Sequence, residues 1–321
     1  VETRFMVTRL TYKGIIDTIG NTPLVELQRM TPKEGVRIFA KLEGQNPTGS
    51  VKDRIALKMI EQAERDGEIS ANRTILEPTS GNTGISLAMI GRLKGYKVAV
   101  VMPENVSVER VQLLEAYGAE IIPSDGTRGT NGAIEVAQDL IEKRGSDYFM
   151  PYQYGNSGNP DAHYETTGPE IIEALPDVSM FVAGLGTGGT LMGVARRLKE
   201  HNTDTKIVAV APEPDDFISG LRSLEEGFIP PILDIDVLDS RMLVNSFDAF
   251  ATTKRLLAEE GIFAGVSSGS VVYGAMRQAE RMDKGDIVCL LADGGWKYLS
   301  TALWTKDYDE LAKEAKGKIW W

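Results

Sequence analysis

The chain contains one cysteine and two histidines among its 321 residues. A single thiol, Cys289, excludes an intramolecular disulfide and a cluster of thiolate metal ligands. His163 and His201 leave no pattern from which a Ser-His-Asp triad or a histidine-rich metal site can be argued. We therefore expect no metal centre, structural or surface roles for both histidines, and a core position for Cys289.

Basic residues are also scarce, because 35 lysines and arginines stand against 46 aspartates and glutamates, for a formal net charge of -11. This balance argues against a nucleic-acid binder, since a phosphate backbone requires a basic face. We see no signal-peptide pattern and no apolar run near the ~20 residues of a membrane span. The sequence predicts a cytoplasmic protein, and Val1–Phe5, which precede Met6, are given no fold prediction.

Apolar segments of strand length alternate with helical patterns through most of the chain. The alternation predicts βαβ units, parallel sheets and two α/β domains separated by a cleft. Segment 151–160, rich in Gly, Asn, Pro and Tyr, is the expected crossover between the domains. The predicted strands are 74–77, 98–102, 119–122, 180–183, 206–211 and 286–292. The predicted helices are 83–93, 107–117, 248–260 and 271–282, with two more that start near Ser50 and after Gly189.

A lysine occupies an unusual place in the helix that starts near Ser50. Lys52 falls in its first turn, after a turn formed by Pro47 and Gly49. The positive end of the helix dipole disfavours a cation there, which lowers the pKa of the amine and suits a nucleophile. A solvated surface lysine is the alternative for this feature by itself.

Two further turns precede helices and carry hydroxyl groups. Segment 78–84 suits a bound carboxylate, because exposed N–H groups at a helix N-terminus attract anions, or it is an ordinary N-cap turn. In segment 265–270, the hydroxyls either cap the following helix or hydrogen-bond a ring nitrogen.

The glycine-rich segment 184–190 suits a phosphate, because glycines let the backbone approach it closely. Gly184, Gly186 and Gly189 also fit the dinucleotide fingerprint, with Glu213 as the ribose acid. The alternative interpretation of this segment is therefore a nicotinamide-dependent dehydrogenase.

Taken together, the four turns resemble the cysteine synthase family of fold-type-II pyridoxal-phosphate (PLP) enzymes, over about Ile16 to Thr301. The resemblance implies an α/β, tryptophan-synthase-β-like fold with two mostly parallel sheets. It implies a smaller mobile domain, 46–155, with Lys52 and the Asn82 loop. Residues 1–45 plus 156–321 would form a larger domain that binds the PLP phosphate. The motifs that carry the resemblance are 46–54, 79–84, 186–190 and 265–269, with 20–25 and 167–171 in support.

The resemblance also assigns roles to individual residues. Lys52 would carry PLP as a Schiff base and act as general base, and Asn82 would contact the ring hydroxyl. Ser267, rather than Ser268, would face the pyridine nitrogen. The residues implied for the PLP phosphate are Gly186, Thr187, Gly188, Gly189 and Thr190. The residues implied for the substrate carboxylate are Thr79, Ser80, Thr83 and Gln153.

The implied reaction is β-replacement through an aminoacrylate to give L-cysteine. Segment 221–230 resembles mycobacterial-type O-phosphoserine sulfhydrylases, in which an arginine recognises the substrate phosphate. Arg222 falls on that position, and Lys206 is assigned an assisting role. Because a guanidinium binds a phosphate by two parallel hydrogen bonds, the sequence favours O-phosphoserine as donor.

Segment 294–301 resembles the same subgroup, in which a small sulfur-carrier protein with a C-terminal thiocarboxylate supplies the sulfur and the chain's C-terminal tail covers the active site. Here the chain ends in Ile319–Trp321, unlike the subgroup's usual tail. The family also implies a homodimer. The alternatives are an O-acetylserine sulfhydrylase using free sulfide, a cystathionine β-synthase and a degenerate relative that binds PLP without turnover.

Overall fold

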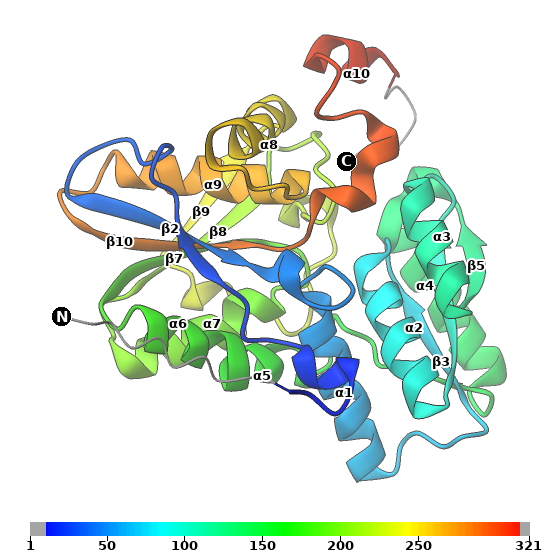
Figure 1. Ribbon diagram of the computed structural model, residues 1–321. Coiled ribbons are helices and arrows are strands. Elements are labelled where there is room, and N and C mark those ends of the chain that lie inside the picture. The colour runs from blue at the N-terminus through cyan, green and yellow to red at the C-terminus, as the bar shows by residue number, and fades with distance from the viewer. Residues whose placement is uncertain (1–10, 315–321) are drawn as a thin grey trace.

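A computed structural model describes residues 11–314 and contains two sheets (Figure 1). The six-stranded sheet has the order β1-β2-β10-β7-β8-β9, and the four-stranded sheet has the order β5-β4-β3-β6. Only the pairing of β1 with β2 is antiparallel within these two sheets. The predicted α/β class with two mostly parallel sheets is thus confirmed. Residues 1–5 and 319–321 lie outside the described residues.

All six predicted strands are present to within two residues. Within residues 11–314, the structure adds four strands and four helices that the sequence analysis did not predict, among them a helix of 16 residues, Gly129–Arg144. The strands are β1 (Leu24–Glu26), β2 (Val36–Leu42), β3 (Thr74–Pro78), β4 (Lys97–Pro103), β5 (Glu120–Ser124), β6 (Tyr148–Phe149), β7 (Val178–Gly184), β8 (Lys206–Pro212), β9 (Ser240–Val244) and β10 (Gly285–Leu291). The helices are α1 (Lys52–Asp66), α2 (Asn82–Lys94), α3 (Val108–Tyr117), α4 (Gly129–Arg144), α5 (Gly158–Ala162), α6 (Gly168–Ala174), α7 (Gly189–His201), α8 (Ser246–Glu260), α9 (Val266–Ala279) and α10 (Tyr308–Glu314).

Helices cover both faces of both sheets, which explains the continuous apolar runs of the central strands. On the large sheet, α8 and α9 pack on one face and α6 and α7 on the other. On the small sheet, neighbouring side chains of β3 point to opposite sides. Ile75 packs with α1 and α2, and Leu76 packs with α4. Helix α1 lies between the two sheets (Figure 1).

The start of α1 is fixed to the large sheet. The backbone N–H of Val51 donates to the carbonyl of Ala292 at 2.8 Å, and Ser50 forms a β-bridge with Asp293. Both partners directly follow β10. Lys52, the first residue of α1, therefore sits at the carboxyl end of a central strand.

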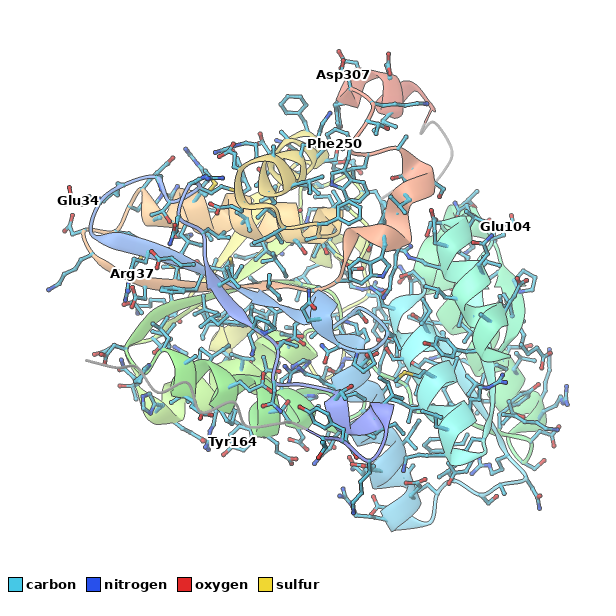
Figure 2. The ribbon with its side chains drawn as sticks, in the orientation of Figure 1. Glu34, Arg37, Glu104, Tyr164, Phe250 and Asp307 are labelled. Atoms are coloured by element: carbon cyan, nitrogen blue, oxygen red, sulfur yellow. The ribbon has the colours of Figure 1, made fainter. Side chains whose placement is uncertain are left out.

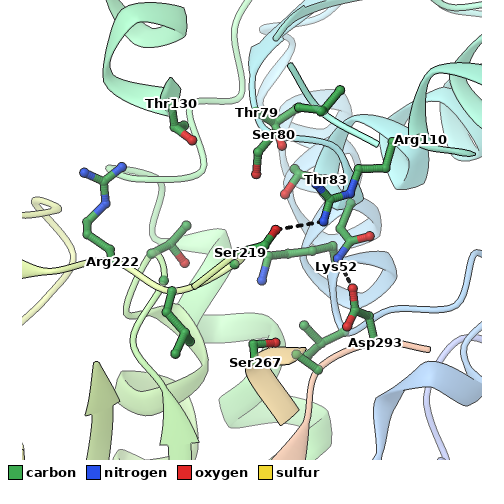
Figure 3. Close-up of a pocket in the computed structure, with 18 of the residues that line it drawn as sticks. Lys52, Thr79, Ser80, Thr83, Arg110, Thr130, Ser219, Arg222, Ser267 and Asp293 are labelled. Atoms are coloured by element: carbon green, nitrogen blue, oxygen red, sulfur yellow. Dashed lines mark hydrogen bonds between the residues drawn. The ribbon is translucent and has the colours of Figure 1, made fainter. Parts of the chain in front are cut away.

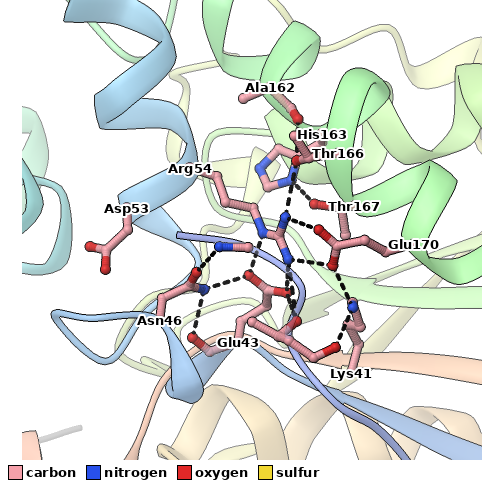
Figure 4. Close-up of polar contacts among 12 residues, drawn as sticks. Lys41, Glu43, Asn46, Asp53, Arg54, Ala162, His163, Thr166, Thr167 and Glu170 are labelled. Atoms are coloured by element: carbon pink, nitrogen blue, oxygen red, sulfur yellow. Dashed lines mark hydrogen bonds and ion pairs between the residues drawn. The ribbon is translucent and has the colours of Figure 1, made fainter. Parts of the chain in front are cut away.

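A buried group of four charges holds α1 from its other side (Figure 4). The Arg54 guanidinium contacts Glu43 at 2.8 Å and Glu170 at 2.6 Å, and the Lys41 amine contacts Glu170 at 2.6 Å. Two cations thus meet two anions, of which Lys41, Arg54 and Glu43 are almost wholly removed from solvent and Glu170 is 15% exposed. The group joins α1 to the end of β2 and to α6.

Glu43→Gln is expected to lower the free energy of unfolding by about 3–5 kcal/mol, because removing one partner leaves a buried charge uncompensated. Burial raises the pKa of Glu43, but Arg54, Thr22 and Lys41 together lower it more, to about 2. Glu43 therefore stabilises the fold above about pH 4.5, and this contribution is lost as pH falls towards 2. Denaturant unfolding at several pH values measures both effects. Arg37→Ala, in an exposed pair with Asp286 (Figure 2), is the control, and an equal loss in both variants contradicts the prediction.

Two further observations concern the described residues as a whole. No helix within 11–314 is both long enough and apolar enough to cross a membrane. The same residues contain no group of three or more His, Cys, Asp or Glu side chains arranged to hold a metal ion. Cys289 is buried in β10, as its apolar neighbours predicted, and burial raises the pKa of its thiol to about 12.

Candidate active site

A cavity of about 120 Å³ opens at the carboxyl ends of β3, β4 and β10, and a smaller space of about 40 Å³ adjoins it at the end of β7. Ligands of open parallel sheets bind at this edge. The two spaces share lining residues, among them Lys52, Gly186 and Ser267. Figure 3 shows the Lys52 amine pointing into the space between the two sheets.

Most of the residues selected from the sequence line this combined cavity. They are Lys52, Thr79, Ser80, Asn82, Thr83, Gln153, Gly186, Thr187, Gly188, Thr190, Arg222 and Ser267. Gly189 is the first residue of α7 and lies directly behind the lining loop. The turns that are far apart in the sequence are therefore adjacent in space.

Lys206 is the exception, and its predicted contact with the substrate is wrong. It is the first residue of β8, whereas the cavity lies at the carboxyl ends of the strands. Its amine is paired with Asp239 at 3.2 Å, and 58% of its side chain is exposed. The direction of β8 places Lys206 at the opposite edge of the sheet.

The electrostatic surroundings of Lys52 favour a neutral amine. Burial lowers the pKa of Lys52, and the nearby Asp293 and Glu43 oppose this shift without cancelling it. The position at the start of α1 acts in the same direction as burial. The amine is therefore available as a nucleophile or base at lower pH than an ordinary lysine.

Asn82 is held at both ends of its amide by residues that the sequence analysis missed. Its Nδ2 donates to Asp293 at 2.7 Å, and its Oδ1 accepts from Lys297 at 2.8 Å. Tyr298 donates to the same Asp293 oxygen at 2.6 Å. Burial lowers the pKa of Lys297 to about 8. The amide of Asn82 therefore faces the cavity in one fixed orientation.

The residues around the start of α2 are hydrogen-bonded to the crossover segment 151–160. The Thr83 hydroxyl donates to Oε1 of Gln153 at 2.7 Å, and Nε2 of Gln153 donates to the carbonyl of Pro78 at 3.3 Å. The carboxyl group of the buried Glu77 accepts the backbone N–H groups of Tyr152 and Gln153, at 2.8 and 3.0 Å, and burial raises its pKa to about 8. Hydroxyls and amides thus converge at the N-terminus of a helix, where an anion is favoured.

The glycine-rich loop lines the cavity with its backbone and packs closely on the protein behind it. Gly188 has a φ of +87°, and a Cβ on Gly186 would lie 3.0 Å from the carbonyl oxygen of Gly220. A Cβ on Gly189 would lie 1.8 Å from the side chain of Asn159. The loop leads into α7, so its N–H groups and the helix dipole suit a phosphate.

Ser267 and Ser268 lie in the first turn of α9, which begins five residues earlier than its predicted start at 271. Ser267 lines both parts of the cavity. Ser268 is fully buried, and within the described part of the chain its hydroxyl has no hydrogen-bond partner. The geometry therefore favours Ser267 as the hydroxyl that a bound molecule meets.

Two arginines lie at the rim of the cavity. Arg222 is 7% exposed, stacks against Tyr154 and Phe228, and donates to Asn131 at 2.8 Å. Arg110, which the sequence analysis missed, donates to Ser219 at 2.9 Å (Figure 3). The available signal for Arg110 was its place in the helix that follows the carboxyl end of strand 98–102.

The buried His163 supports the loop from behind rather than reaching the cavity. Its ring lies 2.9 Å from the Thr167 hydroxyl and 3.2 Å from the Thr190 hydroxyl. Burial lowers its pKa to about 3, so the ring is neutral at physiological pH. His201 is exposed. These positions agree with the structural and surface roles expected for the two histidines.

A lysine amine and a phosphate-sized glycine cradle in one cavity fit pyridoxal phosphate. The family model "Pyridoxal-phosphate dependent enzyme" matches residues 15–293. The molecule is thus a PLP enzyme of fold type II, and the predicted cofactor is confirmed. The alternatives of a nicotinamide dehydrogenase and of a binder without turnover are set aside.

Individual relatives narrow the assignment. A cysteine synthase of Staphylococcus aureus is 45% identical over 304 residues, which cover 92% of this chain and 97% of that protein. A hydrogen sulfide-producing enzyme of Fusobacterium nucleatum matches with a TM-score of 0.85 and 42% identity, over 90% of this chain and 100% of that one. A cysteine synthase (OASS) of Entamoeba histolytica matches with a TM-score of 0.87 and 36% identity, over 97% and 96%. The chain belongs to the cysteine synthase family.

Proposed function

We propose that the protein makes L-cysteine by β-replacement on an O-activated L-serine, with O-acetylserine as donor and sulfide as nucleophile. The observation that carries the proposal is the meeting of the Lys52 amine with an array of hydroxyls and amides in one cavity. The names of the relatives support the acetyl ester, because O-acetylserine sulfhydrylases are among them. The predicted preference for O-phosphoserine has no such support and becomes the second candidate.

In this proposal, Lys52 would anchor the cofactor covalently until the substrate's amine replaces it, and the Lys52 amine so released would then accept the substrate's α-proton. Bound PLP supplies an electron sink for the carbanion that forms at Cα. The lowered pKa of Lys52 favours the neutral form of its amine, which is the form able to accept that proton. The proton leaves Cα before the group on Cβ departs.

The substrate carboxylate is proposed to bind at the start of α2. Thr79, Ser80 and Thr83 offer hydroxyls there. Because Thr83 donates to Oε1 of Gln153, the Gln153 amide is oriented with its Nε2 as the group still able to donate. A carboxylate then accepts from Gln153 and from the α2 loop together.

Cofactor contacts are proposed for three elements. Asn82 would donate to the ring hydroxyl, Ser267 would face the ring nitrogen, and loop 186–190 would hold the phosphate. A neutral hydroxyl at the ring nitrogen leaves that nitrogen mostly unprotonated, in contrast to an aspartate. A weaker electron sink favours β-elimination over transamination.

The second candidate function uses O-phosphoserine, and Arg222 is the observation that favours it. Its guanidinium lines the cavity and donates to Asn131, and the five N–H donors of a guanidinium leave others for a phosphate. An acetyl ester offers no charge to compensate for burying this cation. Lys206 takes no part in this candidate.

Other features rest on resemblance alone and are proposed as such. The unit 46–155 would move against 1–45 plus 156–321 as substrate binds, and Arg54 would tie the Lys52 helix to the larger unit. A homodimer, a cytoplasmic location and a thiocarboxylated sulfur-carrier partner complete the proposal. Sedimentation tests the dimer, and a comparison of free sulfide with a thiocarboxylated carrier tests the sulfur donor.

The proposed function is tested by incubating purified holoenzyme with O-acetylserine or O-phosphoserine and sulfide, and by quantifying cysteine. Cysteine should form with the acetyl ester and not with serine itself. Homocysteine in place of sulfide tests the cystathionine β-synthase alternative. Absence of cysteine with both activated donors would refute the proposal.

Glu77→Gln is expected to raise KM for the amino-acid donor about tenfold, since a buried hydrogen bond lost to a backbone N–H costs about 1–3 kcal/mol. The glutamine amide accepts only one of the two N–H groups of Tyr152 and Gln153 and turns a donor towards the other. Initial rates at fixed sulfide give KM and kcat. Glu64→Gln, which breaks a pair with Lys94 away from the site, is the matched control, and an unchanged KM in Glu77→Gln contradicts the prediction.

A further inference from the structure

Asn159 joins two parts of the site, the segment of Gln153 and the glycine-rich loop, that the sequence analysis did not link. It lies in α5, is 1% exposed, and donates through Nδ2 to the carbonyl of Gln153 at 2.8 Å. The same Nδ2 donates to the Thr187 hydroxyl at 2.9 Å. One amide group thus links the segment of Gln153 with the glycine-rich loop.

The orientation of this amide is fixed by chemistry. A backbone carbonyl only accepts, so the group that faces the Gln153 carbonyl must be the NH₂ of Asn159. The Oδ1 then lies against Gly189, where a Cβ would approach it to 1.8 Å. Within the described residues this oxygen has no hydrogen-bond partner. Turning the amide over would place its Oδ1 against the carbonyl oxygen of Gln153. Two acceptors would then face each other, so this orientation is disfavoured.

The fixed amide determines what the Thr187 hydroxyl can do. A hydroxyl has two acceptor positions and one hydrogen to donate. The Thr187 oxygen accepts from Asn159 at 2.9 Å and from the backbone N–H of Gly189 at 3.3 Å. Both acceptor positions are filled, and Thr187 lines the cavity. Its hydrogen therefore remains to be donated to a molecule in the cavity.

We propose that Asn159 is a positioning residue that makes Thr187 a dedicated hydrogen-bond donor to the cofactor phosphate. The inference rests on the proposed assignment of loop 186–190 to that phosphate. Asn159 acts through Thr187 and does not itself touch the ligand. Because it also holds the Gln153 carbonyl, it keeps the phosphate loop in register with the proposed carboxylate site.

Asn159→Asp is the most specific test, because it keeps the size of the side chain and replaces its donor by acceptors. The Thr187 hydroxyl would then donate to the introduced carboxylate rather than into the cavity, and a negative charge would lie close to the phosphate. Holoenzyme variants are dialysed to equilibrium against graded PLP, and the bound fraction is read from visible absorption. We expect the PLP Kd to rise about tenfold in Asn159→Ala and Thr187→Val and further in Asn159→Asp, as for loss of a hydrogen bond to a charged group.

The same titration with pyridoxal, which lacks the phosphate, separates positioning from general damage. Its affinity should change less than about twofold in each variant, because the lost interaction is with the phosphate. The double variant Asn159→Ala with Thr187→Val should bind PLP no more weakly than Thr187→Val alone. Asn202→Asp, an exposed residue whose Oδ1 accepts from the backbone N–H of Asp204, is the control for added charge.

The outcomes distinguish the inference from the assignment beneath it. An unchanged PLP Kd in Thr187→Val refutes the phosphate assignment of the loop. A raised Kd in Thr187→Val with an unchanged Kd in both Asn159 variants overturns the role of Asn159. Equal losses for PLP and pyridoxal overturn it too, since they indicate a structural role. If Asn159→Asp fails to fold, the PLP Kd values of Asn159→Ala and of the double variant still test the role of Asn159.

Discussion

Replacing Lys52 by alanine is expected to abolish cysteine formation, with kcat lowered by at least about 10³-fold, as for loss of a positioned base. The reason is that one amine is proposed both to anchor the cofactor and to move the α-proton. No other lysine lines the cavity among the described residues. Lys297 is buried nearby, but its amine is committed to Asn82. The variant should also lose the visible absorption of a lysine-linked cofactor.

Absorption spectra and initial rates of purified holoenzyme measure these effects. Lys58→Ala is the matched control, because Lys58 lies on the same helix and its amine pairs with Glu165 outside the cavity. This control should keep both the absorption and the rate. Retention of the cofactor band by Lys52→Ala, with more than a tenth of the rate, would move the anchoring role to another residue.

The fold was predictable wherever strands are buried on both faces. The apolar runs at 98–102 and 206–211 become β4 and β8 with shifts of one residue at most. The strands β1, β6 and β9 were missed because they are short or half exposed at sheet edges. The interior strand β2 was missed as well, because Arg37 and Lys41 interrupt its apolar run. The start of α9 was missed because its first residues are small and polar. Its Gly269 packs so closely on α8 that a Cβ would lie 2.1 Å from Thr253.

The site was predictable as a set of turns but not as a network. Each selected turn precedes a helix at the carboxyl end of a strand or joins a strand end, so sheet topology alone brings the turns together. Lys206 was misplaced although the sequence already put it at the start of the predicted strand 206–211, whereas ligands of parallel sheets bind at the carboxyl ends of the strands. Asn82 meets Lys297 across 215 positions, and Arg110 meets Ser219 across 109. Such pairings depend on packing between the two sheets, which local sequence patterns do not encode.

Arg222→Ala is expected to separate the two candidate donors. The kcat/KM for O-phosphoserine should fall about 100-fold, since a charged hydrogen-bonded pair at a partly desolvated site is worth about 1.5–3 kcal/mol per bond. The kcat/KM for O-acetylserine should change less than about threefold, because an uncharged ester forms no ion pair with the guanidinium. Arg222→Lys should recover only part of the phosphoserine rate, because an ammonium lacks the two parallel donors of a guanidinium.

Lys206→Ala is the matched control for removal of a cation, because its amine faces Asp239 at the opposite edge of the sheet. The kcat/KM values for both donors should be unchanged in Lys206→Ala. Initial rates with each donor at saturating sulfide give the comparison. Equal losses on both donors in Arg222→Ala would assign Arg222 to closing the cavity with Asn131, Tyr154 and Phe228 rather than to binding a phosphate. A selective loss on phosphoserine, in an enzyme that also turns over the acetyl ester, would show that one arginine at the rim sets donor preference while the Lys52 site performs the same chemistry on both.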